Sequence, residues 1–300
     1  MRKIWTIQEL LKEMVDYFRK LEFLNARLEV ELLLADILNK DRLWLYLHPD
    51  QPLTSKELAL FKKSIIRRYY REPVQYIIGH WGFWTLDLEL TPDVLIPRPE
   101  TETLIEAVIR VKQRSARIID IGTGSGNIVI ALARELKDAH FWAVDISQKA
   151  LAVAKENASR YEVLHKIDFL LGNLFEPLEG IVTPHSIDLI VSNPPYIPSA
   201  DIDHLQPEIS RFEPRLALDG GKDGLDFYRK IIHSAPYFLK NGGQLVMEFG
   251  EGQSNSIIEM MRHQGSYDKW KCVKDYNKKD RVIIIKKGDT HCGEDLYSGG

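Results

Sequence analysis

The sequence predicts an α/β fold: a doubly wound, mostly parallel sheet of seven strands, preceded by a small helical domain. From Arg117 onward, short apolar runs alternate with segments of helical period, which is the pattern of a doubly wound sheet. A glycine-rich loop follows the first of these runs, and an Asn-Pro-Pro-Tyr segment follows the fourth. The 300-residue length accommodates one large domain and a smaller one.

The predicted strands are short apolar runs bounded by turn-forming residues. We expect them at residues 117–121, 140–144, 167–171, 187–192, 244–249, 270–275 and 281–286. Helices are expected near residues 127–136, 147–160, 224–239 and 253–264. Strands that alternate with helices pair in parallel through crossover connections, so most of the sheet is expected to be parallel.

Residues 1–72 are expected to form a helical domain with its own core. Thr-Ile-Gln-Glu at residues 6–9 and Thr-Ser-Lys-Glu at residues 54–57 both have the form of a capping box. Apolar residues recur at helical spacing after each box, and Asn25 is placed to cap another helix between them. The run Arg-Arg-Tyr-Tyr-Arg at residues 67–71 is either a solvated helix end or a patch that contacts nucleic acid.

Residues 73–97 are expected to connect the two domains through a β-hairpin. Its arms are predicted at residues 76–79 and 84–90, and the second arm alternates between apolar and polar residues. The segment Ile-Pro-Arg-Pro-Glu-Thr-Glu that follows is held extended by its prolines until a new helix begins. Arg98 and Glu100 in this segment belong either to a capped linker or to the mouth of a binding site.

The composition restricts the classes of function. A formal net charge of −3 and a pI of about 6.3 provide no global positive field for nucleic acid. Cys272 and Cys292 are far apart and share no metal-ligand spacing, so we expect reduced thiols and no metal site. No apolar run approaches the ~20 residues that span a bilayer, and the amino terminus lacks a signal-peptide core. We therefore expect a cytoplasmic protein without a membrane partner.

The glycine-rich loop is expected to bind a ligand that carries a ribose. Gly122, Gly124 and Gly126 lie between a predicted strand and a predicted helix, where glycines allow close approach of the backbone. The third glycine comes one residue earlier than in the dinucleotide fingerprint. Asp145 ends the next strand and is placed to accept hydrogen bonds from both ribose hydroxyls; alternatively it is a loop acid. After the third strand, Asn173 and Leu174 offer an amide and an apolar face that could hold an adenine, although such a short segment alone could be loop filler.

The segment Asn193, Pro194, Pro195 and Tyr196 ends the fourth strand abruptly, because proline cannot donate to a sheet ladder. Its carbonyls, the Asn193 amide and the Tyr196 ring form a rigid cup at the carboxyl end of a strand, where open α/β sheets bind ligands. Such a cup suits a planar nitrogen with two N–H groups, either an amide or an exocyclic base amine. The alternative is a proline-rich turn that only ends the strand.

The glycine loop, the acid after the next strand and the Asn-Pro-Pro-Tyr segment, in this order, resemble a class I S-adenosylmethionine-dependent methyltransferase. Residues 72–79, 95–102 and 211–214 (Arg-Phe-Glu-Pro) closely resemble the HemK/PrmC protein-glutamine methyltransferases. This likeness runs from about residue 1 to residue 286. It implies a Rossmann-like methyltransferase domain at residues 98–287. The polar, small residues at 288–300 predict a flexible tail.

The resemblance implies N5-methylation of the glutamine in the Gly-Gly-Gln motif of peptide-chain release factors, with S-adenosyl-L-homocysteine as the product. The motif Asn193, Pro194, Pro195 and Tyr196 would hold the glutamine. Where some family members carry a tryptophan in the adenine pocket, this chain has Leu174, which would weaken stacking. The cofactor positions carried over by the resemblance are Gly122, Thr123, Gly124, Ser125, Gly126, Asp145 and Asn193.

We expect catalysis by positioning, in which the Asn193 side-chain oxygen and the Pro194 carbonyl hold the substrate NH₂ group and Tyr196 packs on the flat amide. The helical domain is expected to recognise the release factor. One alternative is a DNA or RNA adenine-N6 methyltransferase, because the same cup suits an exocyclic amine stacked on Tyr196. The acidic pI argues against a nucleic acid partner. The other alternative is a non-catalytic module that only binds the cofactor.

Overall fold

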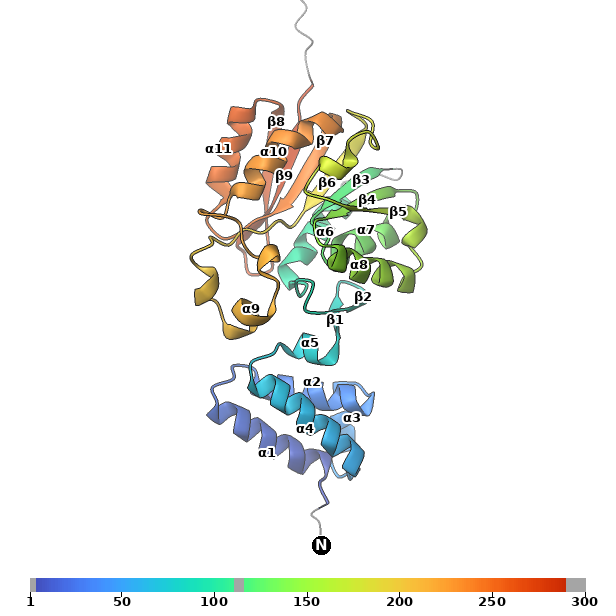
Figure 1. Ribbon diagram of the computed structural model, residues 1–300, viewed down its shortest axis with the longest axis vertical. Helices are drawn as coiled ribbons and strands as arrows, with labels where there is room; N and C mark the ends of the chain where they lie inside the picture. Colours follow the sequence, from blue (N-terminus) through green and yellow to red (C-terminus); the bar gives the residue numbers. More distant parts are fainter. Residues whose placement is uncertain (1–3, 111–115, 290–300) are drawn as a thin grey trace, which may run out of the picture. The chain divides into compact units, whose positions relative to one another are not determined.

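The computed structural model describes residues 4–110 and 116–289 of the chain (Figure 1). Among these residues, contacts define two compact units. The first contains the residues up to His80 together with Gln206–Phe212, and the second contains Trp81–Leu205 and the residues from Glu213 onward. The predicted tail from residue 290 onward, which includes the predicted free thiol of Cys292, lies outside the described residues. The predicted domain boundaries stay a prediction.

The first unit is helical and has its own core of buried apolar side chains. Both predicted capping boxes are present, with Glu9 N–H bonded to Thr6 and Glu57 N–H bonded to Thr54. Asn25 stands at the predicted N-cap, but its side chain makes no capping bond. The helices are α1 (Ile7–Lys20), α2 (Ala26–Leu38), α3 (Arg42–Leu47), α4 (Ser55–Tyr69), α5 (Val74–Ile78) and α9 (Pro207–Phe212).

The arginines at the end of α4 form ion pairs within this unit. Arg67 Nε donates to Glu72 at 2.8 Å, and Arg68 Nη2 donates to Glu208 of α9 at 2.8 Å. Arg71 Nη1 also lies 3.4 Å from the Glu208 carboxylate. Carboxylates therefore oppose the charge of all three arginines, which favours a structural helix end over a nucleic acid patch.

The second unit contains a sheet that, in the described residues, has seven strands in the order β5-β4-β3-β6-β7-β9-β8. Pairing is parallel from β5 to β7, and β9 is antiparallel to both β7 and β8. The predicted doubly wound, mostly parallel sheet is confirmed. Its strands are β3 (Arg117–Ile121), β4 (His140–Asp145), β5 (Ile167–Leu171), β6 (Ile187–Ser192), β7 (Leu239–Glu248), β8 (Tyr267–Lys274) and β9 (Asp280–Lys287).

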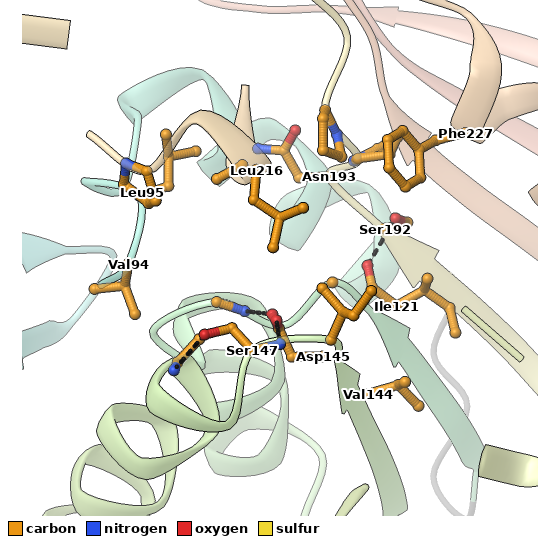
Figure 2. Close-up of a pocket in the computed structure, with 18 of the residues that line it drawn as sticks. Val94, Leu95, Ile121, Val144, Asp145, Ser147, Ser192, Asn193, Leu216 and Phe227 are labelled. Carbon is orange, nitrogen blue, oxygen red and sulfur yellow. Dashed lines mark hydrogen bonds between the residues drawn. The ribbon is translucent and has the colours of Figure 1, made fainter. Parts of the chain in front are cut away.

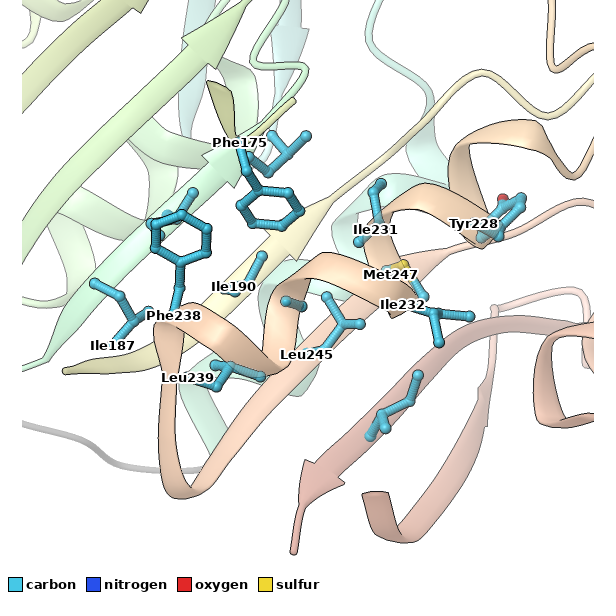
Figure 3. Close-up of a cluster of buried hydrophobic side chains, with 14 of the residues drawn as sticks. Phe175, Ile187, Ile190, Tyr228, Ile231, Ile232, Phe238, Leu239, Leu245 and Met247 are labelled. Atoms are coloured by element: carbon cyan, nitrogen blue, oxygen red, sulfur yellow. The ribbon is translucent and has the colours of Figure 1, made fainter. Parts of the chain in front are cut away.

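The helices of this unit are α6 (Glu102–Arg110), α7 (Asn127–Glu135), α8 (Gln148–Arg160), α10 (Asp226–Phe238) and α11 (Ser254–Gln264). Helix α10 buries its apolar side against one face of the sheet (Figure 3), and Ile257 and Met261 of α11 belong to the same core. In that core Phe175 stacks on Phe238 of α10, with ring centroids 5.1 Å apart. Helices α6, α7 and α8 adjoin one another and pack on the sheet from its other face (Figure 1). The chain turns from β5 back to β6 beside β3, so the β3–β6 boundary is the switch point where such sheets bind ligands.

The connector contains the predicted hairpin, but the prediction for its first arm was wrong. Residues 74–78 form helix α5, which begins after Pro73 and ends at Gly79 with φ +82°. The hairpin itself consists of β1 (His80–Phe83) and β2 (Leu86–Glu89). Proline before the first turn and a left-handed glycine after the last are helix boundary signals that outweigh the local strand propensity of Tyr-Ile-Ile.

Asn157 of α8 joins the hairpin to the glycine loop. Its amide nitrogen donates to the carbonyls of Glu89 and Ser125, and its oxygen accepts the Glu89 N–H. The side chain is fully buried, so these bonds are not exchanged for water. The connector therefore supports the loop at the carboxyl end of β3.

Candidate active site

A cavity lies at the carboxyl ends of the central parallel strands (Figure 2). Its volume is about 920 Å³, including the part open to solvent, which is in the range of small-molecule sites. Most of the lining is apolar, with a few polar groups at the strand ends. The lining residues are Asp93, Val94, Leu95, Ile121, Gly122, Gly124, Val144, Asp145, Ile146, Ser147, Ala150, Gly172, Asn173, Leu174, Ser192, Asn193, Pro194, Pro195, Pro214, Leu216, Ala217 and Phe227.

The glycine loop presents bare backbone to this cavity. Gly122 and Gly124 line it, with φ of +75° and +56°, and a Cβ on either would meet no atom within 4 Å. Gly126 has a different, structural role, because a Cβ there would lie 2.8 Å from Ile130 Cδ1 and 3.2 Å from Ala154 Cβ. The first two glycines therefore leave room for a ligand, and the third allows α7 and α8 to pack closely.

Thr123 and Ser125, both predicted to bind cofactor, are buried and do not line the cavity. The Thr123 hydroxyl donates to Asp120 Oδ2 at 2.7 Å. Burial raises the pKa of Asp120 to about 7, although the Thr123 hydrogen bond opposes this shift. The Thr123 hydrogen bond helps to hold the shape of the loop, and the predicted contact of Thr123 and Ser125 with cofactor stays a prediction.

Asp145 ties the loop to the end of β4 and faces the cavity. Its Oδ2 accepts the Gly124 N–H at 2.8 Å, and its Oδ1 accepts the Ser147 N–H at 2.9 Å. Burial raises the pKa of this carboxyl, and the backbone donors oppose the shift. Ser147, rather than Asp145, caps α8 through the Ala150 N–H. Since each carboxylate oxygen accepts more than one hydrogen bond, Asp145 retains capacity for ribose hydroxyls.

Asn173 and Leu174 also line the cavity, as do Val144 and Ile146. The Asn173 amide nitrogen donates to Glu176 at 3.0 Å, which holds this loop in place. Leu174 has φ +50°, an unusual value for leucine, and offers an apolar surface but no ring. This wall suits a flat apolar heterocycle.

Asn193, Pro194 and Pro195, which follow β6, also line the cavity. The Asn193 Nδ2 group donates to Thr101 Oγ1 at 3.1 Å, and Thr101 in turn donates to Glu248 Oε2 at 2.6 Å. The Asn193 amide thus directs its nitrogen toward Thr101 and leaves its oxygen for another donor. The ends of β6 and β3 are joined by the Ser192 hydroxyl, which donates to the Ile121 carbonyl at 2.7 Å.

Tyr196 lies beyond the lining of this cavity and packs against the α10–α11 core. Burial raises its pKa to about 12. Gln253 donates to its carbonyl at 3.0 Å, and a Cβ on Gly224 would lie 2.3 Å from the same oxygen. Its predicted stacking on substrate stays a prediction, and Phe227 is an aromatic residue that does line the cavity.

Two of the sequence segments that carried the resemblance meet at a partly buried ion pair. Arg98 Nη2 donates to Glu213 Oε1 at 2.6 Å, and the Ile96 N–H donates to Glu213 Oε2 at 3.3 Å. Burial raises the pKa of Glu213, and the charge of Arg98 opposes that shift. Arg98 therefore holds together two segments whose neighbours Leu95 and Pro214 line the cavity.

Neither a metal cluster nor a membrane span is found in the part of the chain that the structure describes. No three His, Cys, Asp or Glu side chains there are grouped to hold a metal ion. Among residues 4–110 and 116–289, no helix has the length and apolar character needed to cross a membrane.

Comparison with known proteins decides the family. The PrmC N-terminal domain model matches residues 9–79, and a methyltransferase domain model matches residues 112–288. The release factor glutamine methyltransferase of Geobacter sulfurreducens is 45% identical over 94% of this chain and 96% of its own length. The chain belongs to the release factor glutamine methyltransferase family. The family members of Koribacter versatilis and Moorella thermoacetica are 40% and 39% identical, over 88% and 87% of this chain and 92% and 91% of their own lengths.

Solved structures support the fold of this family member. A methyltransferase from Pyrococcus furiosus aligns with a TM-score of 0.51 at 20% identity, over 76% of this chain and 99% of that one. The catalytic domain of hMettl16, solved with a MAT2A 3'UTR hairpin, aligns with a TM-score of 0.54 at 18% identity, over 80% of this chain and 84% of that one. At these identities the likeness concerns the class I methyltransferase fold alone.

Several residues that support the site were not predicted from the sequence of this family member. Thr101 and Glu248 hold the Asn193 amide, while Gly224 and Gln253 hold the Tyr196 backbone. A signal existed for Gly224, since the run Asp-Gly-Gly-Lys-Asp-Gly at residues 219–224 is typical of a tight turn. The side-chain contacts span 57 to 147 residues of sequence and leave no local pattern.

Proposed function

We propose that this protein transfers a methyl group from S-adenosylmethionine to the side-chain nitrogen of the glutamine in the Gly-Gly-Gln motif of peptide-chain release factors. The observation that carries the proposal is the Asn193 amide, whose nitrogen is bound to Thr101 beside Pro194 and Pro195 on the cavity wall. The membership of this protein in a family whose relatives are named release factor glutamine methyltransferases supports the same substrate.

The cavity fits S-adenosylmethionine by the chemistry of its lining. Gly122 and Gly124 leave open space where side chains would stand, which suits close approach of the amino-acid part of the cofactor. The Asp145 carboxylate can accept ribose hydroxyls, and Leu174 with its apolar neighbours can cover an adenine. When bound, this cofactor supplies an electrophilic methyl group on a positively charged sulfur.

The residues around Asn193 position a poor nucleophile, since the lone pair of an amide nitrogen is delocalised into its carbonyl. The Asn193 oxygen and the Pro194 carbonyl accept hydrogen bonds from the substrate NH₂ and fix its orientation. Such positioning is worth several kcal/mol, up to ~7–11 for near-ideal alignment. As the new C–N bond forms and the bond from the methyl carbon to sulfur breaks, positive charge develops on nitrogen, and these fixed acceptors stabilise it. The surplus proton then leaves the nitrogen for water.

The helical domain is the proposed docking surface for the release factor, acting in the cytoplasm during translation termination. A glutamine alone offers little contact area, whereas specific protein pairs commonly bury ~1,200–2,000 Å². The ion-paired arginines at the end of α4 and the acidic pI support a protein partner rather than a nucleic acid.

The test measures labelled methyl transfer from S-adenosylmethionine into purified release factor and, in parallel, into duplex DNA. We expect label only in the release factor. Asn193→Ala should lower transfer by at least ~10²-fold while circular dichroism shows that the fold is retained, because a positioning contact is lost. Label in DNA alone, or an Asn193→Ala variant as active as the parent, would contradict the proposal.

A further inference from the structure

A buried line of polar side chains leads from Asn193 into the protein. Asn193 Nδ2 donates to Thr101 Oγ1 at 3.1 Å, and Thr101 donates to Glu248 Oε2 at 2.6 Å. Thr101 is 0% exposed and Glu248 1% exposed, and neither lines the cavity. Thr101 ends the turn Pro99–Thr101 before α6, and Glu248 ends β7, so two rigid elements hold this line.

The single hydroxyl proton of Thr101 fixes the direction of every bond in this line. An ionised carboxylate only accepts, so Thr101 must give its proton to Glu248. The Thr101 oxygen can then only accept from its other neighbour, which must be the NH₂ end of Asn193. The two ends of an amide are nearly equal in size, so this donor–acceptor order, rather than shape, decides which end faces Thr101.

We propose that Thr101 and Glu248 are positioning residues that hold the Asn193 amide in the one orientation that accepts a hydrogen bond from the substrate NH₂. The proposal rests on the proposed function, because this orientation matters only when the nitrogen that receives the methyl group carries N–H groups that can donate to Asn193. If Glu248 takes up a proton from solvent, its O–H can donate to Thr101, and the Thr101 hydroxyl can donate to Asn193 Oδ1. The Asn193 amide then turns its own NH₂ toward the substrate, and the substrate nitrogen loses an acceptor.

The surroundings of Glu248 place this change near neutral pH. Burial raises the pKa of Glu248 to about 7, while the Thr101 hydrogen bond and the positive charges nearby oppose the shift. The ionised, competent form dominates above that pH and is lost as the pH falls through it. The charged and titratable groups that face Glu248 are Arg98, Glu100, Tyr196, Tyr228, whose hydroxyl donates to the Glu248 carbonyl, and Arg281.

The kinetic test compares three threonine variants with release factor as substrate, well above neutral pH. Thr101→Val keeps the shape and removes the hydroxyl, so kcat should fall by at least ~10-fold with unchanged affinity for S-adenosylhomocysteine. Thr101→Ser restores the hydroxyl and should bring kcat back to within about threefold. Thr103→Val alters a buried threonine two residues away and should match the parent. A Thr101→Val variant with parental kcat overturns the proposal.

A second test follows Asn193 directly and needs no substrate. The side-chain NH₂ resonance of Asn193, assigned by its loss in Asn193→Ala, should shift with a midpoint near the Glu248 pKa of about 7. In Glu248→Gln this shift should disappear, and the acidic fall in kcat should disappear with it. A pH-independent Asn193 resonance in the parent overturns the proposal. If the Asn193 resonance shifts with pH but no methyl group is transferred to release factor, the proposed function is contradicted. The orientation mechanism is then still supported.

Discussion

Replacing Asp145 by asparagine tests whether this residue binds the ribose as well as supporting the glycine loop. Both carboxylate oxygens already accept backbone N–H groups, at 2.8 Å from Gly124 and 2.9 Å from Ser147. Any orientation of an asparagine therefore places its NH₂ against one of these donors. The variant also exchanges hydrogen bonds to a charged group, worth ~1.5–3 kcal/mol each, for weaker neutral ones. Together these losses should weaken the binding of S-adenosylhomocysteine by about 3 kcal/mol, which raises its Kd ~10²-fold.

Calorimetry with S-adenosylhomocysteine and with an analogue that lacks the ribose hydroxyls separates the two roles of Asp145. Removing the hydroxyls should weaken binding strongly in the parent and little in Asp145→Asn, with a coupling energy of ~1.5–3 kcal/mol. Ser147→Ala is the control, since it removes the α8 cap, costs ~0.5–2 kcal/mol of stability and should leave that coupling intact. A coupling energy near zero would show that Asp145 only shapes the loop.

Two further predictions concern stability. Gly126→Ala should lower the free energy of unfolding by ~1–3 kcal/mol more than Gly252→Ala. Both positions have positive φ, but of the two only a Cβ at Gly126 would meet another side chain, at 2.8 Å. Equal losses of stability in urea titrations would refute this packing argument. Arg98→Ala should cost about 2 kcal/mol above the Glu213 pKa, where it leaves a buried carboxylate without its cation. Because Arg98 holds that pKa down, the loss should shrink as the pH falls and Glu213 takes up a proton, and a loss independent of pH would contradict the assignment.

The central sheet was predictable because its signals are local. The runs at residues 117–121 and 187–192 are mostly apolar and are followed by glycine or asparagine, and the structure has strands at these same positions. Burial on both faces of a parallel sheet produces such runs directly. For the same reason the cavity position followed from the sequence, since the loops after these strands meet at one edge.

The remaining features depend on contacts that no local pattern records. Helix α5 at residues 74–78 buries Val74 and Tyr76, and this packing adds to the boundary signals at Pro73 and Gly79. Segment 206–212 belongs to the helical unit through Glu208 and its ion pairs with distant arginines. Thr101 was expected only as part of a helix start, and its bond to Glu248 spans 147 residues.

The measurement that tests the central claim most directly is mass spectrometry of a release factor after incubation with the protein and S-adenosylmethionine. We predict a single added methyl group on the side chain of the glutamine in the Gly-Gly-Gln motif, absent when Asn193→Ala replaces the parent. A release factor that stays unmodified, or carries its methyl group on another residue, would contradict the account.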